Sequence, residues 1–189
     1  MVSQLKVNEI IKQSGSSISI GESGDTINIG TTGDTVNLAG SAYAEASNTP
    51  YFSVRQTGSV TVTDNTNTKV AWNSELVDSD SAFASDKFTV PSGKSGKYFL
   101  YTMTLGRGSA NSYLNVYYLN LYKNGSRIAM SENDLRGNAG RKVTSCVNTI
   151  QDLAAGDYIE VYVKVDINAG TAHYDGGDFQ AMFGGYKIG

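Results

Sequence analysis

The sequence predicts an all-β protein whose larger part is a sandwich or jelly roll. Three observations lead to this fold class. From residue 51 onward the chain carries roughly eight to ten short segments of alternating apolar and polar residues, as in strands with one buried face. No helical period in the chain lasts longer than a turn. The 189 residues include 21 glycines, 12 tyrosines and only two prolines, a composition typical of strands joined by many turns.

The N-terminal part carries a nine-residue repeat whose units open at Gly15, Gly24 and Gly33. Each unit reads as a three-residue apolar-polar-apolar strand between glycine turns. Three such rungs are too few to cover their own apolar face, so we expect strands of three chains to close around one apolar axis. Residues 1–14 fit a short strand or a helical turn equally well. The residues expected to point to that axis are Ile18, Ile20, Ile27, Ile29, Val36 and Leu38.

Changes in this pattern predict three regions. Residues 1–40 form an N-terminal attachment segment and repeat stalk, residues 41–50 form a linker without periodicity, and residues 51–189 form the head. A polar and glycine-rich loop is expected at 166–177. The strands expected in the head are 51–54, 60–62, 69–72, 83–90, 97–105, 113–122, 128–130, 143–153, 158–165 and 178–189, the last with Phe179, Ala181 and Phe183 in phase.

Two local signals in the head are especially clear. Asn124 and Gly125 separate two strand patterns, and both residues tolerate the positive φ of a type I′ hairpin turn. The strand at 158–165 alternates strictly, which predicts that one of its faces is core. The core face would hold the aliphatic residues Ile159, Val161, Val163 and Val165.

Composition excludes several classes of function. The net charge is −3, only 17% of residues are charged, and no lysine or arginine cluster occurs, so a nucleic-acid partner is not expected. A lone cysteine, Cys146, excludes an intrachain disulfide framework, and its place in a strand predicts a small buried side chain. No signal peptide or membrane-spanning run is visible, so we expect a soluble protein made in the cytoplasm.

Four short motifs follow one another in the head: GKYFLYT at 96–102, LYKNG at 121–125, LAAGDYI at 153–159 and FQAMFGGY at 179–186. In this order they resemble the globular heads of complement component one q and its relatives. The resemblance implies a ten-stranded jelly roll of the tumour-necrosis-factor superfold that assembles as a homotrimer. The closing motif departs from the family's Phe-Ser-Gly-Phe, and no collagen-like stalk is present. The immune role of that family is therefore not carried over.

The repeat resembles the N-terminal regions of fibre and surface proteins of tailed bacteriophages. Together, stalk and head imply a non-enzymatic homotrimeric protein of a virion, either a capsid decoration or a short tail fibre, with the head outward and a host glycan as a further partner. A free carbohydrate- or receptor-binding lectin is the alternative. A polysaccharide hydrolase would need a carboxylate pair, for which the sequence offers Glu75, Asp78 and Asp80.

Other chemical motifs are incomplete. Asp25 and Asp34 in the repeat lack the paired glycines of a calcium β-roll. Some relatives of the complement heads bind calcium near the trimer apex, and the resemblance implies Asp175 and Asp178 as the candidate calcium ligands here. His173, the one histidine, has no visible catalytic partner and is expected in a loop. We therefore predict no catalytic residue.

The tyrosines fall in both strand phases, so they cannot all belong to one core. Tyr158 and Tyr162 lie opposite the aliphatic phase of their strand. Tyrosine combines a large apolar ring with a polar tip, which suits a subunit interface or a carbohydrate-binding face. We assign these two residues to the trimer interface, with a glycan contact or an ordinary solvent-facing position as the alternatives.

Overall fold

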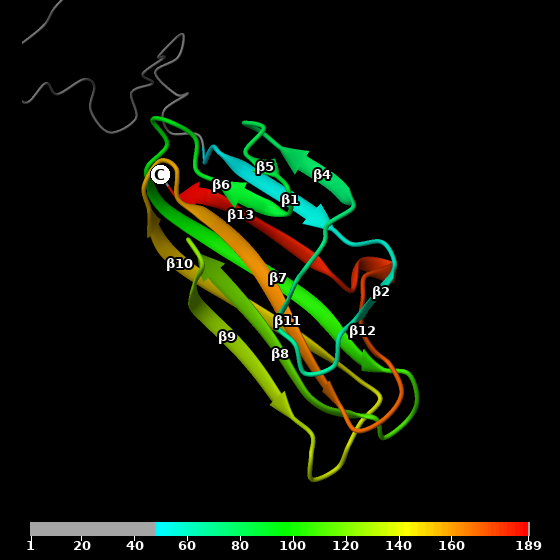
Figure 1. Ribbon diagram of the computed structural model, residues 1–189. Coiled ribbons are helices and arrows are strands. Elements are labelled where there is room, and N and C mark those ends of the chain that lie inside the picture. The colour runs from blue at the N-terminus through cyan, green and yellow to red at the C-terminus, as the bar shows by residue number, and fades with distance from the viewer. Residues whose placement is uncertain (1–47, 189) are drawn as a thin grey trace, which may run out of the picture. The chain divides into compact units, whose positions relative to one another are not determined.

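A computed structural model describes residues 48–188, which form two antiparallel β-sheets packed face to face (Figure 1). In the seven-stranded sheet, β7 is the central strand: β10 pairs along one side of it, and β13 and β12 pair along the other. The sheet continues from β13 through β1 to β4, and from β12 to β2. Its strands are β1 (Tyr51–Arg55), β2 (Ser59–Val62), β4 (Ser74–Asp78), β7 (Gly96–Gly108), β10 (Lys142–Leu153), β12 (Ala172–Asp175) and β13 (Met182–Ile188).

The six-stranded sheet has the order β5-β6-β11-β8-β9, and the short β3 also pairs with β11. Because β4 and β5 each end their sheet, both lie at one open edge of the sandwich (Figure 1). The strands are β3 (Thr68–Lys69), β5 (Phe83–Ala84), β6 (Lys87–Thr89), β8 (Leu114–Lys123), β9 (Ser126–Asp134) and β11 (Tyr158–Ile167); a 3₁₀ turn, η2, spans Gly177–Phe179. None of the described segments forms the long apolar helix that a membrane crossing requires.

The core lies between the sheets, and β11 contributes to it as its alternation predicts. Ile159, Val161, Val163 and Val165 are fully buried, whereas the intervening residues are partly exposed. The prediction for this strand is therefore confirmed. It holds because a strand with one strictly aliphatic phase has only one face that can be removed from water.

An aromatic cluster fills one end of the core. The ring of Phe52 lies 4.4 Å from that of Phe88 in a stacked arrangement and 4.9 Å from that of Phe183 in an edge-on arrangement. Trp72 and Phe83 add their rings 5.9 Å and 6.1 Å from Phe183. Such contacts stabilise the core beyond the burial of area alone. Phe183 thus joins β13 to the segments at the open edge of the sandwich.

Several expected strand boundaries are wrong. The expected loop at 166–177 contains β12, where His173 pairs with Thr61 of β2, so His173 is a strand residue. Residues 74–78, which are absent from the expected strands, form β4. The expected strand at 83–90 is broken by a turn at Ser85 and Asp86, both with positive φ. These strands are two to five residues long, too short for a periodic signal to distinguish them.

The final strand also begins later than expected. Phe179 ends the turn η2 with φ at +61° and is half exposed, whereas Ala181 and Phe183 are buried. Phe179 is therefore out of the core, and its ring lies under the guanidinium of Arg55 instead, 4.4 Å from ring centre to Cζ. The positive φ interrupts the alternation on which the expected phase depended.

The β8–β9 hairpin turns at Asn124 and Gly125, whose φ angles of +51° and +78° confirm the prediction. Asp157 ties this turn to β11. Its carboxylate lies 2.8 Å from Lys123 Nζ and accepts hydrogen bonds from the Asn124 amide and the Ala154 N–H, at 2.7 and 2.8 Å. The Lys123 hydrogen bond first, and then those from Asn124 and Ala154, lower the pKa of Asp157 from 3.8 to about 2.

This carboxylate makes part of the stability acid-sensitive. Because the pKa is lower in the folded than in the unfolded chain, the stabilisation is complete above about pH 4 and disappears as the pH falls toward 2. We expect Asp157→Asn to lower the free energy of unfolding at neutral pH and to differ progressively less from the wild type between pH 4 and 2. Urea unfolding from neutral pH down to pH 2 measures the difference in the free energy of unfolding between the two proteins. Asp152→Asn, at an exposed carboxylate, is the control, and a constant Asp157→Asn deficit would contradict the assignment.

Candidate functional site

The outer face of the seven-stranded sheet carries a row of large apolar side chains. The register pairs Ile150 with Phe99, Phe99 with Tyr186, and Tyr186 with Tyr51, and directly paired residues share one face of a sheet. The row therefore crosses β10, β7, β13 and β1. Ile150 is 59% exposed, Tyr51 43% and Tyr186 38%, and Phe99 is half-buried.

Neighbouring rows extend this surface. Tyr101 lies over Gly184, where any Cβ would collide with the Tyr101 hydroxyl, and that hydroxyl donates to Ser53 Oγ at 3.3 Å. Val77 and Ile188 are exposed on the same face. The exposed pair of Lys97 Nζ and Asp152 Oδ1, 2.9 Å apart, lies one residue pair beyond the row on β7 and β10. We call the set Tyr51, Val77, Phe99, Tyr101, Ile150, Tyr186 and Ile188 the aromatic face.

An apolar surface that spans several strands and is bordered by charged residues is typical of a protein–protein interface. The tyrosines supply area together with a polar tip, which suits a surface that alternates between water and a partner. The sequence contains part of this signal, because Phe99, Tyr101 and Met103 share one phase of the strand expected at 97–105. The other phase, with Tyr98 and Leu100, is also apolar, so periodicity could not show which phase lies outside.

Tyr158 and Tyr162, the predicted interface residues of the head, lie on the other sheet. The Lys87 ammonium lies over the Tyr158 ring at 4.7 Å, and the Tyr162 ring lies 4.7 Å from that of Tyr122. Both side chains are partly exposed on the outer face of β11. The structure therefore places both tyrosines on the outer face of the six-stranded sheet, apart from the aromatic face. The predicted stalk residues, Ile18, Ile20, Ile27, Ile29, Val36 and Leu38, lie outside the described residues.

Of the two candidate calcium ligands, Asp175 is engaged by arginine. Arg107 contacts its carboxylate through Nε at 2.6 Å and through Nη2 at 3.2 Å. Asp178 lies in the turn η2. Beside them, His173 Nδ1 is 3.3 Å from Thr61 Oγ1, and its pKa is lowered by burial and then by Arg107. Residues 48–188 contain no group of three or more histidine, cysteine, aspartate or glutamate side chains arranged to hold a metal ion.

Two further predictions concern single residues. Cys146 is exposed, not buried, because it pairs with Met103 in β7 in the outward phase of β10. Asp78 accepts hydrogen bonds from the N–H groups of Ala82 and Phe83, at 3.0 and 2.8 Å, so both of its oxygens hold the chain after β4. Asp78 therefore stabilises the turn that follows β4.

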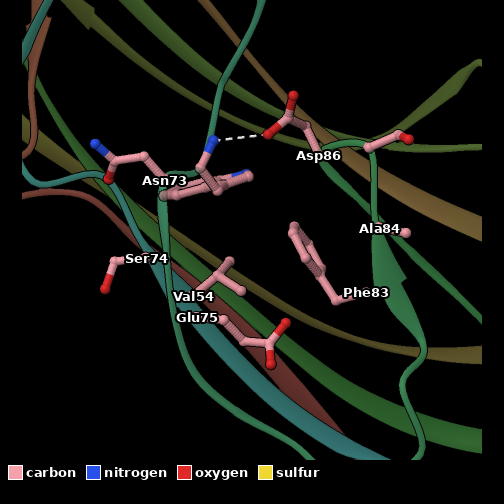
Figure 2. A pocket seen from close by; sticks show the side chains of 9 residues that line it. Val54, Asn73, Ser74, Glu75, Phe83, Ala84 and Asp86 are labelled. Atoms are coloured by element: carbon pink, nitrogen blue, oxygen red, sulfur yellow. Dashed lines mark hydrogen bonds between the residues drawn. The ribbon is translucent and has the colours of Figure 1, made fainter.

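A pocket of about 330 Å³ lies at the open edge of the sandwich, between β4 and β5 (Figure 2). In Figure 2 the Phe83 ring projects from β5 toward Val54, and the side chains of Asn73 and Ser74 point away from the pocket. Of the three carboxylates named for a hydrolase, only Glu75 lines the pocket. The nine lining residues are Val54, Trp72, Asn73, Ser74, Glu75, Phe83, Ala84, Ser85 and Asp86.

Comparison with known proteins bears on the fold. The globular domain of zebrafish complement 1qA protein superposes with a TM-score of 0.51 and 18% sequence identity, over 74% of this chain and 98% of that one. No family model matches the sequence, and no curated protein matches it. The structural likeness confirms the all-β, jelly-roll head that the four motifs implied.

Proposed function

We propose that the protein is a non-enzymatic homotrimer on the surface of a bacteriophage particle, attached through residues 1–40 with the head outward. The aromatic face carries the trimer part of this proposal. It exposes Ile150, Tyr51 and Tyr186 in one row across the sheet, and a second and third copy of the head are the partners that would cover it. The family resemblance of the head implies the same assembly.

The particle role depends on the N-terminal repeat. Its nine-residue period resembles that of phage fibre and surface proteins, and three copies of a short β-repeat can cover an apolar axis that one copy leaves open. A 27-residue repeat region is too short for a long shaft, which favours capsid decoration, whereas the stalk pattern favours a short tail fibre. Copy number on purified capsids and tails distinguishes these two places.

Deletion of residues 1–40 is the direct test of attachment. We expect residues 41–189 to fold into the same head, with a cooperative thermal transition, because the two sheets described above lie wholly within residues 48–188. We also expect the shortened protein to be absent from particles made in cells that express it in place of the full chain. Immunoblots of purified particles measure this.

A point substitution provides the matched experiment. Ile27→Asp places a charge in the repeat and should abolish attachment while the head stays folded, because a carboxylate on an apolar axis has no partner. Asn28→Asp, at the neighbouring polar position, is the control and should attach normally. Incorporation of the deletion variant at wild-type copy number would contradict the anchoring role.

A free lectin-like protein is the second candidate, and the pocket at the open edge of the sandwich is compatible with it. Both candidates allow a glycan partner for the head. They differ in where the protein is found, since a lectin that works apart from any virion would not copurify with capsids or tails.

A further inference from the structure

We infer that the pocket between β4 and the β5–β6 hairpin binds a neutral hexopyranose, as a free sugar or as one unit of a glycan. The inference deepens the glycan-binding part of the proposed function and rests on it for its biological role. The binding site itself lies within a single head. Its volume of about 330 Å³ is at the lower end of the range for small-molecule sites, as a single sugar ring requires.

Aromatic side chains form the apolar part of the pocket. Trp72 and Phe83 line it together with Val54, and Phe83 is only half-buried. The C–H groups on a face of a pyranose ring are apolar and pack against aromatic rings. A flat apolar wall beside polar groups is therefore suited to a ligand that is apolar on its face and polar at its edge.

The polar part of the pocket is held in a defined position. Ser85 and Asp86 form the turn between β5 and β6 with φ angles of +51° and +58°, a conformation that costs free energy for residues other than glycine. Two contacts hold it: the Lys69 ammonium donates to the Ser85 carbonyl at 2.8 Å, and the Trp72 backbone N–H donates to Asp86 Oδ1 at 2.7 Å (Figure 2). The strained turn thus brings the Asp86 carboxylate to the pocket wall.

The second carboxylate comes from the opposite edge of the pocket. Glu75 is exposed on β4 and lines the pocket from the seven-stranded sheet. Carboxylate oxygens accept hydrogen bonds and donate none, so the ligand must supply O–H or N–H groups. An anionic ligand would be repelled by Glu75 and Asp86, which excludes phosphates and acidic sugars.

The indole of Trp72 decides between the remaining ligand classes. Its Nε1–H is buried and has no hydrogen-bond partner among the described residues. An ammonium ligand brings only donors and would leave this N–H unpaired, whereas a sugar hydroxyl can accept from it and also donate to a carboxylate. Because the nitrogen is covered, a hydroxyl reaches it only when a neighbouring side chain moves.

The chain has its own reporter for this test, because Trp72 is its one tryptophan. Full-length protein is titrated with glucose, galactose, mannose and N-acetylglucosamine while tryptophan fluorescence is recorded, and calorimetry provides the affinity. We expect a saturable fluorescence change with at least one of these sugars. Ethylammonium, which carries N–H donors and no hydroxyl, should produce none.

Two variants test the roles of the polar groups. Trp72→Phe keeps an aromatic wall and removes the N–H, and Asp86→Asn keeps an acceptor for the Trp72 backbone and tolerates positive φ. Each should weaken the calorimetric affinity by about tenfold, the value of one hydrogen bond. Glu132→Gln on β9, at the far end of the six-stranded sheet from β5, is the control and should bind as the wild type does.

The inference fails if none of the four sugars changes the fluorescence or releases heat, if ethylammonium binds in their place, or if both pocket variants bind with wild-type affinity. Light scattering on the same sample separates this failure from that of the proposed function. A trimer that attaches to particles without binding sugar would overturn the pocket assignment alone. A sugar-binding protein that does not attach to particles would overturn the particle role and leave the pocket in place.

Discussion

Phe99→Glu is expected to convert the proposed homotrimer into a monomer with an intact fold. Phe99 occupies the middle of the aromatic face, between Ile150 and Tyr186 in the register. In the assembled protein its replacement would bury a carboxylate without a partner, which costs several kcal/mol. In the monomer the same side chain is on the outer surface of the sheet, where a carboxylate is solvated. Assembly is therefore affected far more than folding.

Light scattering at micromolar concentration measures this result. The mass should fall to one third of the wild-type value, with a dissociation constant raised by at least a hundredfold, while circular dichroism and the melting temperature of the head change little. The wild type must be a trimer under the same conditions, and a monomeric wild type would remove the basis of the prediction.

The control for this variant also tests the interface predicted from sequence. Tyr162→Glu places the same charge on the outer face of the six-stranded sheet, beside Tyr122. We expect Tyr162→Glu to remain trimeric. If it dissociates while Phe99→Glu does not, the subunits meet through β11, as the alternation of that strand first suggested.

Phe183→Ala is expected to cause the largest loss of stability among single substitutions in the aromatic cluster. Phe183 is fully buried and contacts Phe52, Phe83 and Trp72, so truncation leaves a cavity at the junction of β1, β5 and β13. Buried phenylalanine-to-alanine changes cost about 3–5 kcal/mol. For a domain of this size that loss corresponds to a melting temperature lower by roughly 10 °C.

Urea unfolding and thermal melting of the full chain provide both quantities. Phe179→Ala is the matched control. The phenyl ring at position 179 is half exposed, and among the ring and cation contacts described it meets only the Arg55 guanidinium. Its cost should stay below about 1 kcal/mol. Equal losses for the two variants would show that the cluster does not carry the stability assigned to it.

The fold class, the long strands and one turn follow from the sequence because their causes are local. The aliphatic phase of β11 can be buried on only one side, and Asn124–Gly125 supplies the positive φ that a hairpin turn requires. Both features can be predicted without knowing which residues pack against them. The four motifs of the head extend them to the jelly roll that the structure shows.

Shorter elements could not be predicted because their pairing partners are distant in the chain. β12 exists because β2 and β7 lie on either side of it, more than 60 residues away. β4 likewise depends on β1. Strands of four or five residues obtain their regular structure from such ladders, and their own pattern is too brief to indicate it.

The candidate sites depend on the tertiary structure for the same reason. Both phases of β7 are apolar, so only its place in the sandwich decides that Tyr98 is core and Phe99 is surface. The pocket joins β1, the loop before β4, β4 itself, β5 and the strained turn after β5, which sequence spacing leaves unrelated. The sequence alone thus determined which residues share a face; the packing of two sheets, which removes one face of each from water, decided which faces remain for a partner or a ligand.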